Sequence, residues 1–211
     1  VDYESLVDQG DPLYDWNMPS DEWSPLSLSY TSGTTGKPKG VVYHHRGSYL
    51  MSMGTVVGWN LPNHPIYLYS VPLFHCNGWG HAWTMAALAG TVVCLRSFDP
   101  QKVFTLLDEY HVTHFGGAPI MLNMLANAPE EIKKSFDREI KVMTAGAPPP
   151  AKVLESMMSL GFNVMHVYGL TETYGHILQA APQASWLNES PAELARLSSR
   201  QGVRFPMTED V

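Results

Sequence analysis

Strand-length apolar runs alternate with helix-length amphipathic stretches along the chain from Pro65 onward. This order predicts an α/β fold, in which a mostly parallel sheet carries helices on both faces. The expected strands are 66–71, 91–95, 112–115, 140–144 and 162–167. The expected helices are 79–88, one that begins at Pro100 after Asp99, one from 120, one entered through the prolines 148–150, and one from Ser190 to 197.

The carboxyl ends of the expected strands are the first place to look for chemistry, because ligands of open α/β sheets bind beyond those ends. The segments that follow the strands are His75, Gly116–Gly117, Gly146–Ala147 and 168–172. We therefore look for candidate site residues in these four segments first.

Composition excludes several classes of protein. The 211 residues carry a net charge of −7, so a nucleic-acid partner is not expected. With 45% apolar residues the chain is not disordered, and no apolar stretch is long enough for a membrane span. Its two cysteines cannot form a disulfide framework, which favours a reducing cytoplasm as the location. The chain begins without Met or a signal peptide, so we interpret it as an interior piece.

Residues 30–40 combine three glycines, four hydroxyl residues and two lysines. Glycines let backbone NH groups turn toward an anion, and the lysines add positive charge in an acidic protein, so the segment is suited to phosphate binding. The alternative is a solvated linker. The segment is not a Walker A loop, because Gly33 and Gly36 are too close and Pro38 stands where Ser or Thr would hold magnesium.

Four collinear segments resemble the adenylate-forming (AMP-binding) superfamily of acyl-CoA synthetases, luciferases and peptide-synthetase adenylation domains. They are the phosphate loop at 30–40, the acyl-pocket segment at 71–79, the segment 144–148 that lines adenine and substrate, and the adenylate motif at 168–173. Residues 43–46 and 74–79 are most similar to short- and medium-chain fatty acyl-CoA ligases, including the methylmercaptopropionate-CoA ligase type.

The resemblance implies a role for each matching residue. It assigns ATP binding to Thr31, Ser32, Gly33, Thr34, Thr35, Gly36, Lys37, Lys39, Gly146, Ala147, Pro148, Tyr168, Gly169 and Thr171. It assigns catalysis to Lys39, Thr171 and Glu172, with Glu172 as the Mg²⁺ ligand, and acid binding to His75, Trp79, Gly146 and Ala147.

Physical chemistry supports these roles, although each residue has a simpler alternative. The Tyr168 ring can stack on adenine, the Thr171 hydroxyl can donate to an α-phosphate, and Glu172 is a hard oxygen ligand. His75 can gate the carboxylate site, and a bulky Trp79 would shorten the acyl pocket. The alternatives are a core tyrosine, a surface carboxylate, a buried histidine, a core tryptophan and, for Gly146–Ala147, a plain strand-to-helix turn.

The implied reaction has two steps. A carboxylate attacks the α-phosphate of ATP to give acyl-AMP and pyrophosphate, and a thiol, usually CoA, then accepts the acyl group. The expected substrate is a small, mostly apolar monocarboxylate. Two alternatives remain: a non-catalytic ATP/AMP-binding module, and an adenylating enzyme whose acceptor is a carrier protein or oxygen. A homodimer also remains open.

The expected organisation is that of a central piece of the large, two-subdomain N-terminal domain of the superfamily. Residues 1–60 would carry the phosphate-loop part of one α/β subdomain, 64–180 the second subdomain, and 181–211 a helical extension. The C-terminal mobile domain lies outside this stretch, so we expect the fragment alone to be inactive.

Overall fold

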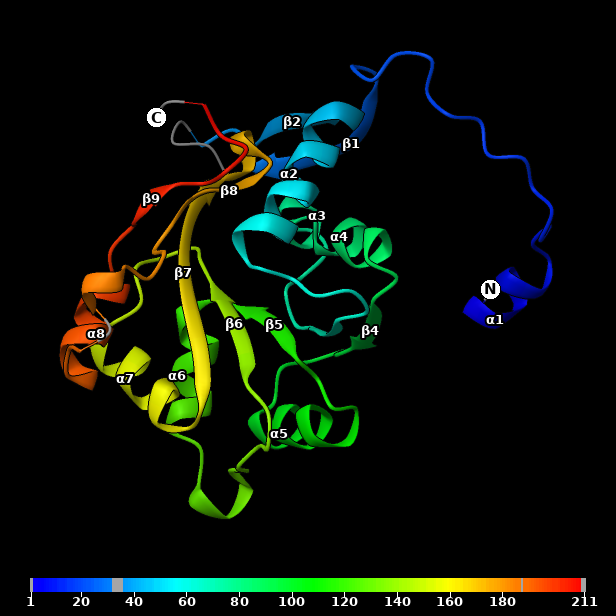
Figure 1. Ribbon diagram of the computed structural model, residues 1–211. Helices are drawn as coiled ribbons and strands as arrows, with labels where there is room; N and C mark the ends of the chain where they lie inside the picture. The colour runs from blue at the N-terminus through cyan, green and yellow to red at the C-terminus, as the bar shows by residue number, and fades with distance from the viewer. Residues whose placement is uncertain (1, 32–35, 187, 210–211) are drawn as a thin grey trace.

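The first part of the chain forms a helix, a hairpin and a second helix. The computed structural model describes residues 2–31, 36–186 and 188–209. The short α1 (Tyr3–Asp8) stands apart at the end of an extended segment (Figure 1). The strands β1 (Pro25–Thr31) and β2 (Lys39–His44) then pair antiparallel as a separate two-stranded sheet, and α2 (His45–Gly58) follows β2 directly.

A seven-stranded sheet organises the rest, in the order β4-β3-β5-β6-β7-β8-β9. Its strands are β3 (Ile66–Tyr69), β4 (Thr91–Cys94), β5 (His114–Gly117), β6 (Ile140–Thr144), β7 (Phe162–Leu170), β8 (Gly175–Gln179) and β9 (Val203–Arg204). The strands from β4 to β7 are parallel, while β8 and β9 add antiparallel to the edge. The predicted mostly parallel α/β sheet is therefore confirmed.

Helices cover both faces of this sheet. They are α3 (Cys76–Trp79), α4 (His81–Ala87), α5 (Pro100–Glu109), α6 (Pro119–Ala126), α7 (Ala151–Ser159) and α8 (Pro191–Ser198), with 3-10 turns η1 (Glu130–Ile132), η2 (Thr171–Thr173) and η3 (Ala184–Trp186). No helix among the described residues is long and apolar enough to cross a membrane.

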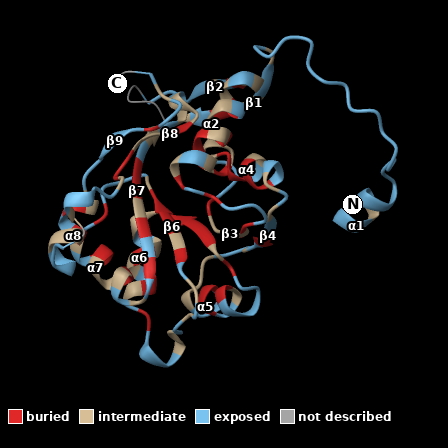
Figure 2. Ribbon diagram, in the orientation of Figure 1, coloured by how far each residue is buried: buried red, intermediate tan, exposed pale blue. Residues whose placement is uncertain are grey.

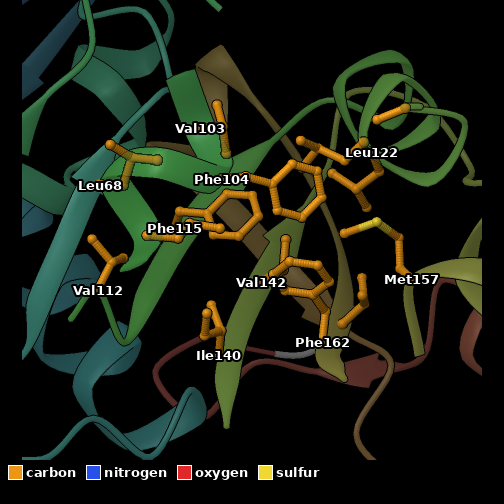
Figure 3. Close-up of a cluster of buried hydrophobic side chains, with 14 of the residues drawn as sticks. Leu68, Val103, Phe104, Val112, Phe115, Leu122, Ile140, Val142, Met157 and Phe162 are labelled. Atoms are coloured by element: carbon orange, nitrogen blue, oxygen red, sulfur yellow. The ribbon is translucent and has the colours of Figure 1, made fainter. Parts of the chain in front are cut away.

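Neighbouring residues of the central strands point to opposite faces and build two cores. Figure 3 shows the first, where strand residues such as Leu68 and Val142 pack against Phe104 and Met157 of the helices α5 and α7. The second core contains Tyr67, Met143 and Val167 from the same strands, with Trp59 and Met85. Buried residues accordingly concentrate on the central strands (Figure 2). The carboxyl ends of the parallel strands and the hairpin together line the candidate site.

Local signals fixed several element boundaries. The Asp99 carboxylate accepts a hydrogen bond from the Lys102 backbone N–H at 2.9 Å, which caps α5 as predicted. The Ser190 hydroxyl caps α8 through the Glu193 N–H at 3.3 Å. The Glu193 carboxylate pairs with Arg196 of the same helix.

Several sequence-based boundaries were wrong, among them that of the strand expected over 66–71, which ends at Tyr69. The helix expected over 79–88 is interrupted, since α3 ends at Trp79 and Gly80 adopts a left-handed conformation before α4. The strand expected at 112–115 is His114–Gly117, and the strand expected to end at 167 continues to Leu170. The last difference has a clear cause, because the antiparallel β8 pairs with residues 167–170 and extends the ladder.

Candidate active site

A cleft of about 430 Å³ lies at the carboxyl ends of the parallel strands. Segments far apart in sequence line it: Thr31 of β1; Val71, Pro72, His75, Cys76 and Trp79 after β3; Gly117, Ala118 and Met121 at β5 and α6; Ala145 and Gly146 after β6; Val167, Gly169 and Leu170 of β7; Thr171 and Glu172 of η2; and Gly175 and His176 of β8. Most of these side chains are apolar. The site therefore combines an apolar cleft with the polar residues Thr171 and Glu172.

One wall is a left-handed turn at residues 76–80. Its φ values are +45° at Cys76, +51° at Asn77, +64° at Gly78, +60° at Trp79 and +69° at Gly80. Such a run is sterically costly for residues with a Cβ, by about 1–2 kcal/mol each, and asparagine tolerates it better than most. The turn places Cys76 and Trp79 on the cleft.

Two contacts hold this turn in place. The Ser27 hydroxyl of β1 donates to the Asn77 side-chain oxygen at 2.8 Å, and the Tyr69 hydroxyl donates to the Gly78 carbonyl at 3.3 Å. A helix that opened at Asn77–Gly78 would put His75 and Trp79 on one face, but the backbone is left-handed there. Both side chains nevertheless line the cleft, His75 as an exposed residue and Trp79 as a half-buried one.

The part of the wall next to this turn is η2, which supplies Thr171 and Glu172. The Thr171 carbonyl accepts a hydrogen bond from the Tyr43 hydroxyl at 2.6 Å, and the Thr171 hydroxyl lies 3.6 Å from the Cys76 sulfur. The ring of Tyr174 stacks on Tyr43 with centroids 4.4 Å apart. These contacts fix Thr171 while the Glu172 carboxylate remains exposed beside it. The two predicted catalytic residues of the adenylate motif therefore share the mouth of the cleft.

The hairpin β1–β2, whose strands flank the predicted phosphate loop, reaches the cleft at Thr31. Thr31, which lines the cleft, is the ladder partner of Lys39. Lys37 and Lys39 are exposed, and Gly36 has a φ of +81°, a conformation that glycine adopts without strain. The predicted ATP-binding residues 32–35 lie outside the described residues.

The predicted adenine-binding residues lie around the same strand ends. Gly146 lines the cleft with a φ of +94°, whereas the neighbouring Ala147 and Pro148 are exposed and outside the described lining. Tyr168 is 36% exposed and projects to the opposite face of β7 from Val167, a cleft residue. It was expected at a strand end, but β7 continues past it. Their roles in ATP binding stay predictions.

Three buried histidines, His81, His114 and His176, were not among the predicted site residues. His81 is completely buried, and its Nδ1 lies 2.6 Å from the Tyr67 hydroxyl. Burial lowers the pKa of His81 to about 3 and those of His114 and His176 to about 4. His176 lines the cleft. The only sequence signal was its position three residues after the 168–173 motif.

Comparison with known proteins decides the family. The AMP-binding enzyme family matches residues 2–209 of the chain. The chain belongs to this family. Among its relatives, 2-methylpropanoate–CoA ligase CCL4 of Humulus lupulus is 49% identical over 203 residues, which are 95% of this chain and 36% of that protein. Acetate/butyrate–CoA ligase AAE7, peroxisomal, of Arabidopsis thaliana is 45% identical over 212 residues, or 100% and 37% of the two chains.

Solved structures of AMP-binding relatives share the fold. O-succinylbenzoate coenzyme A synthetase of Bacillus subtilis, in complex with ATP and magnesium ion, superposes with a TM-score of 0.74 at 25% identity. The match covers 90% of this chain and 39% of that one. The chain thus spans little more than a third of the length of the curated relatives cited above.

Proposed function

We propose that the intact protein is an ATP-dependent acid–thiol ligase, which activates a short- or medium-chain, mostly apolar carboxylic acid to acyl-AMP and transfers the acyl group to CoA. The observation that carries this proposal is the position of Thr171 and Glu172 at the mouth of an apolar cleft, next to the hairpin of the phosphate loop. Relatives named as CoA ligases for 2-methylpropanoate, acetate and butyrate support the acid class and CoA as the acceptor.

Adenylation is chiefly a problem of charge, since a carboxylate must approach the triphosphate. Lys37 and Lys39 neutralise phosphate charge from the hairpin, and the Thr171 hydroxyl donates to an α-phosphate oxygen as charge moves to the departing pyrophosphate. The cleft residues exclude water from the acyl-AMP. No covalent nucleophile from the protein is required, because the carboxylate oxygen forms the new bond and pyrophosphate leaves.

Glu172 fits a magnesium site of the kind that nucleotide enzymes use. The described residues contain no cluster of three or more histidine, cysteine or acidic side chains. Mg²⁺ at nucleotides takes one or two carboxylates and completes its shell with phosphate oxygens and water, so a single exposed carboxylate at the mouth is sufficient. The ion would offset the negative charge of the pyrophosphate.

Trp79 and the left-handed turn set the size of the acid in this proposal. The indole is half-buried and lines the cleft. A rigid indole there leaves room for a short acyl chain, and no lysine or arginine among the described lining residues would pair with a second carboxylate. A monocarboxylic acid is therefore the favoured substrate.

We also propose the domain division and location of the protein. Residues 1–60 belong to a phosphate-loop subdomain and 64–180 to the second α/β subdomain, with 181–211 as an extension, and the remainder of the protein completes catalysis. The free cysteines Cys76 and Cys94 suit the reducing cytoplasm. Fluorescent tagging of the full-length protein tests for the cytoplasm against the peroxisome. The peroxisome is the location given in the name of one relative.

Carboxylate-dependent exchange of pyrophosphate into ATP tests the proposed function. The full-length protein is assayed with Mg²⁺ and acids from acetate to decanoate, and we expect exchange that peaks at short or medium acids. Lys39→Ala should reduce the rate by about 10²-fold or more, because it removes a phosphate-facing charge. Lys152→Ala, which removes a surface lysine paired with Glu155, should leave the rate unchanged.

Two results would contradict the proposal. ATP binding without exchange for any acid would identify a nucleotide-sensing module instead of a ligase. Exchange followed by transfer to a phosphopantetheinyl carrier or to oxygen, but not to CoA, would retain the adenylation step and replace the acceptor.

A further inference from the structure

His176 is the one buried polar side chain among the described residues that line the cleft. It is 3% exposed, whereas the other polar lining residues, such as Thr171 and Glu172, are half-buried or exposed. In the antiparallel ladder of β7 and β8, His176 pairs with Gly169, which lies two positions before Thr171. The imidazole therefore faces the cleft close to the turn where the carboxylate of the acid is activated in the proposed function.

The hydrogen bonds of Thr55 fix the tautomer of His176. Thr55 has a single hydroxyl proton, which it donates to the Met51 carbonyl at 2.9 Å. The same oxygen lies 3.2 Å from Nε2 of His176, so it accepts a hydrogen bond from that nitrogen. The proton of the neutral ring consequently resides on Nε2, and Nδ1 has a free lone pair.

The surroundings keep this imidazole neutral. Phe205 packs against it edge to face with centroids 4.5 Å apart, and burial lowers the pKa of His176 to about 4. The nearest titratable ring is His81, 6.3 Å away, which is also neutral because burial lowers its pKa to about 3. Nδ1 is therefore a hydrogen-bond acceptor throughout the neutral pH range.

None of the hydrogen bonds formed within the described part of the chain reaches Nδ1 of His176. Buried polar atoms normally have a partner, and an acceptor on a cleft wall can obtain one from a ligand. A hydroxyl suits this position better than an ammonium group, because the only acidic residue in the described lining, Glu172, is at the mouth.

We propose that His176 Nδ1 accepts a hydrogen bond from a hydroxyl group of the acyl chain, so that the preferred substrates are short hydroxy acids. This inference rests on the proposed ligase function and narrows its acid class. Because Gly169, the ladder partner of His176, precedes Thr171 by two positions, a short acid can place its carboxylate at Thr171 and its hydroxyl at His176.

Matched pairs of acids test this proposal in the full-length protein by pyrophosphate exchange. Each pair has a hydroxyl or a methyl group at the same carbon, as in 3-hydroxybutanoate and 3-methylbutanoate, with the substituent at carbon 2, 3 or 4. We expect kcat/KM for at least one hydroxy acid to exceed that of its methyl partner by about 10-fold or more, because the methyl group offers no donor to the Nδ1 acceptor on the cleft wall.

Variants assign that preference to the imidazole. His176→Leu should reduce the hydroxyl-to-methyl ratio to about one, mainly through KM for the hydroxy acid, while His176→Asn retains an acceptor and should retain part of the ratio. Thr55→Val removes the hydroxyl that accepts the hydrogen bond from Nε2. The ring proton is then no longer held on Nε2, and the ratio should fall several-fold. The controls are His114→Leu, a buried histidine off the described lining, and Thr84→Val, a buried threonine whose hydroxyl also bonds a helix carbonyl.

The outcomes separate the two proposals. Exchange with apolar acids and an unchanged ratio in His176→Leu would overturn the role of His176 and leave the ligase function intact. Exchange with no acid at all would overturn both. If His176→Leu fails to fold, the ratios of His176→Asn and Thr55→Val decide, and wild-type ratios in both would overturn the proposal.

Discussion

The Tyr43 hydroxyl donates a hydrogen bond to the Thr171 carbonyl over 2.6 Å, although 128 positions separate the two residues. Tyr43 is 1% exposed, and its ring stacks on Tyr174. It belongs to β2, which directly follows the predicted phosphate loop, while Thr171 begins the turn that carries Glu172. This contact therefore joins the two motifs that the proposed function places around ATP.

Tyr43→Phe should remove the hydrogen bond between the two motifs while retaining the stacked ring. We expect the free energy of unfolding to fall by about 1 kcal/mol and the exchange rate to fall several-fold, because the Thr171 turn loses an anchor. Burial raises the pKa of Tyr43 well above its ordinary value, so the hydroxyl stays a donor and the effect should not depend on pH. Tyr49→Phe, which changes an exposed tyrosine of α2, is the control. Equal exchange rates in wild type and Tyr43→Phe would show that this hydrogen bond has no catalytic role.

The sequence predicted the sheet well because its signals were local. The strand Ile140–Thr144 and the cap at Asp99 depend on residues adjacent in the chain, and both were confirmed. The Tyr43–Thr171 contact carries no such signal, since it depends on how the hairpin meets the sheet.

Two parts of the site were missed for different physical reasons. The strand Gly175–Gln179 lacks a clear apolar alternation and is formed by antiparallel pairing with the end of β7, so His176 was not recognised. The left-handed turn at 76–80 was not predicted, because Asn77–Gly78 is compatible with either hand and the sequence does not show the contacts from Ser27 and Tyr69.

Trp79→Ala should shift the preference of the enzyme toward longer acids. Removing the indole from the wall opens space for additional methylenes, each of which adds apolar contact, so kcat/KM for octanoate relative to acetate should rise about 10-fold. Exchange assays with an acid series measure the ratio. Trp83→Ala, a half-buried tryptophan of α4 outside the described lining, should leave it unchanged. An unaltered ratio in Trp79→Ala would remove this residue from the acyl pocket.

Substitutions at Asn77 should report the cost of the left-handed turn. Asn77→Val places a β-branched residue at a φ of +51°, and we expect thermal unfolding to show a loss of about 2 kcal/mol or more. Asn77→Gly accepts the same φ without strain and loses only the bond from Ser27, which should keep its cost near 1 kcal/mol or below. Equal destabilisation by valine and glycine would mean that the backbone conformation contributes nothing.

The buried histidines should make stability depend on pH below neutrality. Burial lowers the pKa of His81 to about 3 and those of His114 and His176 to about 4, while an unfolded histidine titrates near 6.5. The unfolded state thus binds more protons between about pH 6.5 and pH 4. The stability from neutral histidines is complete above about pH 6.5 and declines as the pH falls, by about 4 kcal/mol per pH unit for three such groups.

Urea unfolding followed by tryptophan fluorescence at several pH values measures that slope. His114→Gln should reduce it by about 1.4 kcal/mol per pH unit, because one buried titrating group is removed. His64→Gln, which replaces an exposed histidine, is the control. A free energy of unfolding that stays constant from pH 6.5 to pH 4.5 would show that the three imidazoles gain protons without opening the core, and that their burial does not limit stability.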